Sequence, residues 1–353
     1  MFKHKDKKEQ TCSYEISPEH ILEVRDLNVR ISVDDYLLHA VRGVNFSLKK
    51  GETLGLVGES GCGKSVTSKE ILGINPDNCR SEGRILYRTK SGEVLNLLEL
   101  DRDGTVYRGI RGAEISMIFQ EPMTAFSPLY TIGNQLSEII LLHDPKATKA
   151  SARQRVLEML TKVGIANPEK RIDQYPHEFS GGMLQRALIA MMLCCDPDLL
   201  IADEPTTALD VTIQAQILDL MRHLQKEFGM SILFITHDLG TVANMCDNVA
   251  VMYLGEIVEY GTVRQIFHNP QHPYTKGLLR SLPKMNQSRE KKLYIIDGVV
   301  PLPVDMKPGC GFNDRCEECI KGVCTGHDIP EFEAESGHMV RCMQMKQLEA
   351  FNG

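Results

Sequence analysis

Short apolar runs alternate with stretches of helically spaced apolar residues along this chain. The runs predict buried strands at residues 53–57, 115–119, 199–202 and 231–235. Helices are predicted at residues 66–72, 131–166, 182–195 and 213–227. Because strands and helices alternate, the pattern indicates an α/β fold with a largely parallel sheet.

Polar and charged residues follow several of these predicted strands directly. They are Lys64, Gln120, Asp203, Glu204 and His237. In open parallel sheets, chemistry sits beyond the carboxyl ends of the strands. We therefore expect these side chains to gather at one edge of the sheet.

The flanking regions differ from this alternating centre. Further strands are predicted at residues 21–24, 27–33, 41–48, 249–252 and 255–259. Beyond about residue 262 the chain becomes richer in Pro, Gly and Cys, and its periodicity weakens. We expect a flexible tail at residues 1–20, a catalytic domain at 21–262 and an extension at 263–353.

Composition adds little constraint on function. The chain has 353 residues, 42% hydrophobic and 25% charged, as in soluble globular proteins. The net charge of −7 argues mildly against a nucleic-acid partner. No apolar run reaches the roughly 18 residues that span a bilayer, and the polar N-terminus has no signal-peptide core. We expect a cytosolic chain, with membrane association only through a partner.

The most specific motif lies between the strand at 53–57 and the helix after it. Residues 58–65 read GESGCGKS and fit the phosphate-binding pattern G-x-x-x-x-G-K-[ST]. The glycines let backbone N–H groups face a polyphosphate, Lys64 reaches the β and γ phosphates, and the Ser65 hydroxyl takes Mg²⁺. The residues expected to hold the nucleotide here are Gly58, Ser60, Gly61, Cys62, Gly63, Lys64, Ser65 and Val66.

A phosphate loop needs an acidic partner strand, and residues 199–204 supply one. Asp203 would hold Mg²⁺, and Glu204 would orient the attacking water and accept its proton. An isolated acidic pair after a strand is as often a solvated loop. The upstream phosphate loop favours the catalytic interpretation.

The sequence FSGGM at residues 179–183 resembles the signature motif, usually LSGGQ, of ABC transporter ATP-binding subunits. The resemblance implies a P-loop NTPase of ABC type, with an antiparallel β subdomain, a helical subdomain carrying the signature and a Cys-rich extension. It also implies that Ser180, Gly181 and Gly182 close on the γ-phosphate held by a second subunit. Phe179 and Met183 depart from the usual motif without removing the helix-end anion site.

Other positions match the family one by one. Gln120 resembles the Q-loop glutamine that contacts Mg²⁺, and His237 resembles the switch histidine at the γ-phosphate. The sequence ALD at residues 208–210 resembles the loop at the dimer seam, with Asp210 as its acid. Tyr36 is the candidate to stack on adenine, although it could be an ordinary loop aromatic. The resemblance thus implies catalytic roles for Glu204, His237 and Gln120, with Mg²⁺ near Ser65, Gln120 and Asp203.

Stretches at residues 177–186, 206–216 and 266–275 are similar to the branch that imports oligopeptides, dipeptides or nickel chelates. The implied assembly has a sister or identical ATP-binding subunit in a head-to-tail dimer, two transmembrane permeases and, indirectly, an extracellular substrate-binding protein. The expected place is the cytoplasmic side of the cell membrane. Two alternatives remain: an ABC ATPase of DNA repair or translation, and an ATPase regulated by a metal- or redox-sensing extension.

Five of the eleven cysteines crowd into the last 44 residues. Thiolates at these spacings suit Zn²⁺ or an iron–sulfur cluster, and unligated thiols remain the plain alternative. The resemblance implies a 4Fe-4S cluster. Its expected ligands are Cys310, Cys316, Cys324 and Cys342, with Cys319 as the alternative.

Overall fold

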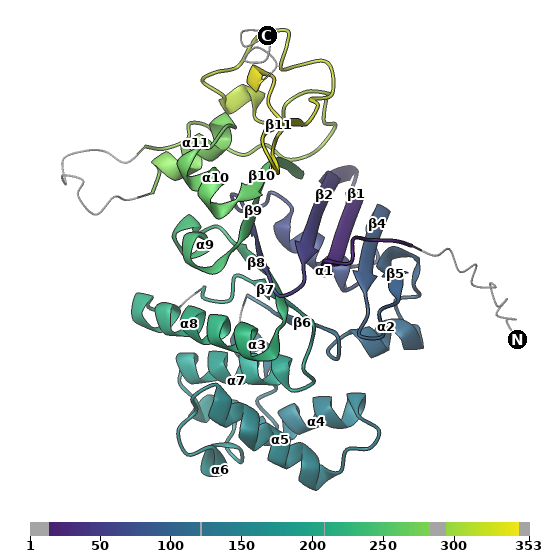
Figure 1. Ribbon diagram of the computed structural model, residues 1–353, viewed down its shortest axis with the longest axis vertical. Helices are drawn as coiled ribbons and strands as arrows, with labels where there is room; N and C mark the ends of the chain where they lie inside the picture. Colours follow the sequence, from purple (N-terminus) through teal and green to yellow (C-terminus); the bar gives the residue numbers. More distant parts are fainter. Residues whose placement is uncertain (1–13, 121, 208, 283–293, 346–353) are drawn as a thin grey trace, which may run out of the picture.

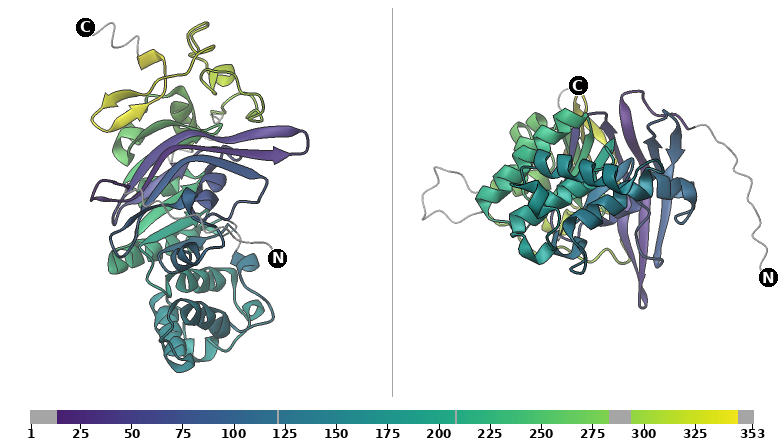
Figure 2. Two further views of the ribbon diagram at one scale, coloured as in Figure 1. Left: turned by 90° about the vertical axis from the view of Figure 1, so that its right-hand side faces the viewer. Right: turned by 90° about the horizontal axis from the view of Figure 1, so that it is seen from below.

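The computed structural model describes residues 14–120, 122–207, 209–282 and 294–345. A large mixed sheet lies at the centre, with a helical subdomain at one end and the C-terminal extension at the other (Figure 1). A second, antiparallel sheet covers one side of the central sheet (Figure 2). This arrangement confirms the predicted α/β class with an antiparallel subdomain, a helical subdomain and a small extension.

The antiparallel sheet has strand order β2-β1-β4-β5. Its strands are β1 (His20–Val33), β2 (Tyr36–Lys49), β4 (Cys79–Arg88) and β5 (Val94–Asn96). The long β1–β2 hairpin spans the three short strands predicted for this region, because register shifts let the pairing continue through their irregular positions. The short 3₁₀ turn η1 (Leu97–Glu99) and helix α2 (Thr105–Ile110) follow.

The central sheet has strand order β11-β12-β10-β9-β3-β8-β7-β6. Its strands are β3 (Thr53–Val57), β6 (Ile115–Ile118), β7 (Leu199–Asp203), β8 (Ser231–Thr236), β9 (Asn248–Tyr253), β10 (Glu256–Thr262), β11 (Phe332–Glu335) and β12 (His338–Val340). Strands β6, β7, β8, β3 and β9 pair in parallel, whereas β10, β12 and β11 add antiparallel pairs.

Both faces of the parallel strands are buried, which explains their unbroken apolar sequence. Leu200 and Ala202 of β7 face the helical side, while Leu199 and Ile201 face the antiparallel sheet. Alternate residues therefore fill two separate hydrophobic clusters. The polar residues that end β7 and β8, Asp203 and Thr236, are still buried.

The helical subdomain packs on the first of these clusters. Its elements are α3 (Pro122–Ala125), α4 (Ile132–His143), α5 (Lys149–Lys162), α6 (Pro168–Arg171), η2 (Pro176–Glu178) and α7 (Gly181–Leu193). Helices α1 (Lys64–Ile71), α8 (Val211–Phe228) and α9 (Leu239–Met245) follow β3, β7 and β8. Helical spacing over residues 131–166 therefore corresponds to two helices, because residues 144–148 leave the helical conformation.

The extension is continuous with the catalytic core rather than separate from it. It comprises α10 (Val263–His268), α11 (Pro273–Arg280), the 3₁₀ turn η3 (Asn313–Arg315), β11 and β12. Strand β12 pairs with β10, so residues 338–340 extend the central sheet. Within residues 14–120, 122–207, 209–282 and 294–345, no helix is both long and apolar enough to cross a bilayer.

Candidate active site

The phosphate loop joins β3 to α1, as its sequence predicts. Gly63 caps α1 with φ = +104°, and a Cβ there would lie 2.4 Å from the Ala40 carbonyl oxygen. A Cβ on Gly58 would lie 2.1 Å from the Met252 carbonyl oxygen. These close approaches leave room only for glycine, so the loop's curvature depends on neighbouring strands as well as on its own sequence.

Lys64 lies buried inside this loop. Its Nζ donates hydrogen bonds to the carbonyl oxygens of Gly58 at 2.8 Å and Glu59 at 2.9 Å. The same Nζ lies 3.6 Å from Sγ of Cys62, which is buried beneath the loop. Neutral carbonyls hold the ammonium, and no carboxylate of the described residues forms an ion pair with it, so its charge is available to a phosphate.

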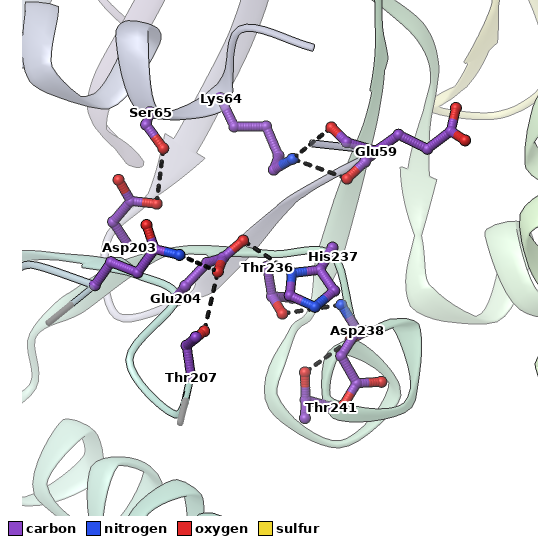
Figure 3. Close-up of polar contacts among 12 residues, drawn as sticks. Glu59, Lys64, Ser65, Asp203, Glu204, Thr207, Thr236, His237, Asp238 and Thr241 are labelled. Atoms are coloured by element: carbon purple, nitrogen blue, oxygen red, sulfur yellow. Dashed lines mark hydrogen bonds and ion pairs between the residues drawn. The ribbon is translucent and has the colours of Figure 1, made fainter. Parts of the chain in front are cut away.

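Ser65 and Asp203 form the link between the phosphate loop and β7. Ser65 Oγ donates to Asp203 Oδ1 at 3.1 Å (Figure 3). Burial raises the pKa of Asp203, partly offset by this hydrogen bond. A hydroxyl and a carboxylate in contact are oxygen ligands of the kind Mg²⁺ prefers, so the pair fits the predicted metal. Gln120, the third expected ligand, contacts Glu204 instead.

Glu204 is the centre of a network of three hydrogen-bond donors (Figure 3). Gln120 Nε2 donates to Oε2 at 2.9 Å, and Thr207 Oγ1 donates to the same oxygen at 2.9 Å. His237 Nδ1 lies 2.8 Å from Oε1. Three strand ends thus supply the network, since Gln120 follows β6, Glu204 follows β7 and His237 follows β8.

The environment keeps Glu204 ionised. Partial burial works to raise the pKa of this carboxyl, but hydrogen bonds from His237 and Thr207 and the charge of Lys64 together hold it below its usual value. The residue also adopts φ = +48°, an unusual conformation for a side chain-bearing residue. An ionised carboxylate, fixed at the strand end beside the phosphate loop, is suited to accept a proton from water.

A pocket of about 750 Å³ opens in front of these residues. Part of its lining comes from the loops that follow the parallel strands: Gly58, Glu59, Ser60, Gln120, Glu204, Thr207, His237 and Leu239. The rest comes from the extension: Leu278, Ser281, Tyr294, Ile295 and Ile296. The extension therefore forms part of the same pocket as the phosphate loop.

The signature residues lie outside this pocket. Ser180 caps α7, where its Oγ accepts the N–H of Met183 at 3.4 Å, and both Ser180 and Gly181 are exposed. Gly182 lies against Ile213 of α8. An exposed helix start with no role in its own chain's pocket is the arrangement that pairing with a second subunit requires.

Asp210, Tyr36 and Val66 are three other predicted residues that lie outside the pocket. Asp210 caps α8 through Oδ1, which accepts the N–H groups of Thr212 and Ile213, whereas Ala208 lies outside the described residues. Tyr36 is 63% exposed at the tip of the β1–β2 hairpin. Val66 lies partly buried on α1. The roles expected for these three residues therefore stay predictions.

Sequence reasoning missed Thr207. Its hydroxyl shares Glu204 Oε2 with Gln120, so it helps to hold the carboxylate ionised. The sequence feature that could have identified Thr207 is its hydroxyl three residues after Glu204, because a turn brings side chains at this spacing together.

The metal centre expected of the extension's thiols stays a prediction. In the part of the chain that the structure describes, no three His, Cys, Asp or Glu side chains are arranged to hold a metal ion. Cys310 and Cys316 pack against the apolar cluster around Tyr274, and Cys324 belongs to another around Ile329. Burial raises the pKa of Cys310 to about 12 and that of Cys316 to about 11, so a metal would have to displace the protons of these thiols in order to bind.

Comparisons with known proteins identify the family to which this sequence is related. Residues 41–207 match the ABC transporter family, and residues 258–324 match the oligopeptide/dipeptide transporter C-terminal region. The dipeptide transport ATP-binding protein DppD of Bacillus subtilis (strain 168) is 53% identical over 93% of this chain and 96% of its own length. The oligopeptide transport ATP-binding protein OppD of the same strain is 49% identical over 91% and 88%.

A structural comparison agrees with the sequence families. The dimeric structure of MJ0796, a bacterial ABC transporter cassette, is 25% identical and has a TM-score of 0.59, over 69% of this chain and 99% of that one. The chain therefore belongs to the family of ABC transporter ATP-binding proteins that carry the oligopeptide/dipeptide transporter C-terminal region.

Proposed function

We propose that this chain is the ATP-hydrolysing subunit that energises peptide import through an ABC transporter. The observation that carries the proposal is Glu204, which three hydrogen-bond donors hold next in sequence to Asp203, the partner of Ser65. The names of its relatives, which transport dipeptides and oligopeptides, supply the substrate class. An ABC ATPase of DNA repair or translation is not favoured, because those relatives match over nearly the whole chain.

In the proposed reaction, the phosphate loop binds the triphosphate and Lys64 neutralises the β and γ phosphates. Mg²⁺, held by Ser65 and Asp203, would supply charge neutralisation at the β and γ oxygens. Glu204 accepts the proton of the attacking water as the water's oxygen bonds to the γ-phosphorus. The bond between the γ-phosphorus and the β–γ bridging oxygen breaks, and ADP leaves with that oxygen. His237 and Gln120 hold Glu204 in place, and in this proposal they also contact the γ-phosphate and the water.

The exposed signature supports a head-to-tail pair of ATP-binding subunits. Ser180 and the N–H groups of Gly181 and Gly182 would approach the γ-phosphate bound by a partner, either identical or a sister subunit. The dimeric assembly of the MJ0796 cassette supports this arrangement. Two permeases in the membrane, and indirectly a substrate-binding protein, complete the proposed importer, which places this chain peripherally on the cytoplasmic side.

A metal centre in the extension is a further proposal that rests on donor chemistry. The thiol charges of Cys342, Cys316 and Cys324 each act on Cys310, so four of the expected ligands are electrostatic neighbours. Ligation by a 4Fe-4S cluster or Zn²⁺ would require these thiols to deprotonate and converge. Anaerobic purification with absorption spectra and iron and zinc analysis tests this, and a colourless protein free of both metals would refute it.

The import function is tested by reconstitution. The chain, purified with its permeases and partner subunit in proteoliposomes, is expected to accumulate labelled dipeptides or oligopeptides with ATP and not without it. The Glu204→Gln variant is expected to abolish uptake while the complex still assembles. Copurification with ribosomes or DNA, without permeases, would contradict the proposal.

A further inference from the structure

The extension reaches back to the phosphate loop through one ion pair. Arg315 Nη1 donates to Glu59 Oε2 at 2.7 Å, and Nη2 donates to Glu59 Oε1 at 3.1 Å. The two residues are 256 positions apart in sequence, and Glu59 is the second residue of the phosphate loop. A bidentate pair of this kind fixes orientation as well as distance.

This ion pair is more enclosed than an ordinary surface pair. The Arg315 side chain is only 6% exposed and that of Glu59 29%. The guanidinium also lies near the rings of Tyr253 and Phe312. Hydrogen bonds and the charge of Glu59 raise the pKa of Arg315, so it stays protonated. Because the pair is largely shielded from water, removing one partner leaves an uncompensated charge, which costs more than breaking an exposed ion pair.

Every polar group of Glu59 is engaged. Its N–H donates to the Tyr274 hydroxyl at 2.9 Å, and its carbonyl oxygen accepts from Lys64 Nζ. Its side chain points away from Lys64 (Figure 3) and pairs with Arg315. Glu59, whose carbonyl oxygen binds Lys64, is therefore itself bound by two parts of the extension, α11 through Tyr274 and η3 through Arg315.

Arg315 also contacts the part of the extension that lines the pocket. Its Nε donates to the Asp297 carbonyl oxygen at 3.0 Å, and Nη2 donates to that of Ile296 at 3.4 Å. Ile296 and Glu59 both line this pocket. One side chain thus links the extension's part of the lining to the phosphate loop.

We propose that Arg315 is a positioning residue for ATP, which sets the start of the phosphate loop through Glu59. Arg315 lies on η3, between Cys310 and Cys316, so the folding of this thiol-bearing loop sets where the guanidinium lies. Three aromatic rings pack against one another next to the guanidinium, those of Tyr253, Tyr274 and Phe312. This packing restricts the position of the Arg315 side chain. The extension is therefore part of the nucleotide site.

The test is a double-mutant cycle on ATP binding, made in a Glu204→Gln background so that ATP persists. Arg315→Gln and Glu59→Ala each remove the ion pair and are each expected to weaken ATP binding about tenfold. AMP binding should change little, because AMP lacks the β and γ phosphates that the loop holds. The double variant should lose about the same tenfold, since both changes break one interaction.

Arg153→Gln is the matched control, because Arg153 makes a comparable bidentate pair with Asp173 at 2.8 Å, away from the pocket. It should bind ATP as the background protein does. The proposal is overturned if Arg315→Gln binds ATP normally, if ATP and AMP weaken equally, or if the two losses multiply. Should Arg315→Gln fail to fold, Glu59→Ala decides alone, and unchanged ATP affinity in that variant overturns the proposal.

Discussion

His237 Nδ1 lies 2.8 Å from Glu204 Oε1, which joins the ends of two adjacent parallel strands. The histidine side chain is 61% exposed, whereas Glu204 is 16% exposed. His237 therefore orients the shielded carboxylate of Glu204, while its own exposed ring is free to turn toward a phosphate. Gln120 and Thr207 hold the other carboxylate oxygen, so His237 can move without releasing the base.

Replacing Glu204 by Gln should separate binding from hydrolysis. The amide keeps the size of the side chain and cannot accept a proton from water, so kcat is expected to fall by about 10²–10⁴-fold with ATP still bound. Steady-state ATPase rates and ATP titrations measure the two effects. Glu169→Gln, an exposed change on α6, is the control, and wild-type turnover in Glu204→Gln would refute the role of Glu204.

Replacing Lys64 by Ala should instead weaken binding itself. The buried ammonium makes charge-assisted contacts with phosphate, and its loss is expected to raise the Kd for ATP by about 10–100-fold. Lys69→Ala, on the same helix, should leave the Kd within about twofold. Calorimetric titration with ATP makes the comparison, and equal losses in the two variants would contradict the assignment.

Two glycines of the phosphate loop should respond very differently to a methyl group. Gly63→Ala would place Cβ 2.4 Å from the Ala40 carbonyl oxygen, so the loop must move and ATP binding should be lost. Gly61→Ala meets no atom within 4 Å, and its φ of +80° costs only about 1–2 kcal/mol of strain. ATP affinity and thermal melting of both variants test this, and similar affinities would show that the close approach is unimportant.

His39 should make stability fall on the acid side of neutrality. Partial burial, together with the charges of Arg30 and Arg42, lowers its pKa below 6.5. The unfolded chain therefore takes up a proton before the folded one, and the free energy of unfolding decreases as pH drops below 6.5. Because the ring is only half-buried, the slope should be well under about 1.4 kcal/mol per pH unit.

His39→Gln isolates this effect, since an amide can still donate to Asn28 Oδ1 as His39 Nε2 does at 3.1 Å. Melting temperatures of the two proteins, compared at about pH 7.5 and about pH 5.5, should differ more at the lower pH. The wild type should lose more stability than the variant. A parallel decline in both would contradict the assignment.

The core of the site was predictable because its chemistry is local in sequence. Gln120, Glu204 and His237 each follow a recognisable apolar strand, and parallel topology brings such positions together. Arg315 had no such signal, because its partner lies 256 residues away and only the folded extension brings them together. The thiol site was predicted from cysteine spacing and a family resemblance, neither of which determines how far apart the folded thiols lie.

The central claim is that one subunit's signature completes the nucleotide site of another. Its most direct test is a structure of the Glu204→Gln protein, bound to its partner subunit and Mg-ATP. We predict that Ser180 lies within hydrogen-bond distance of the γ-phosphate held by the partner's phosphate loop. If Ser180 instead lies far from every γ-phosphate in the nucleotide-bound assembly, the claim is wrong.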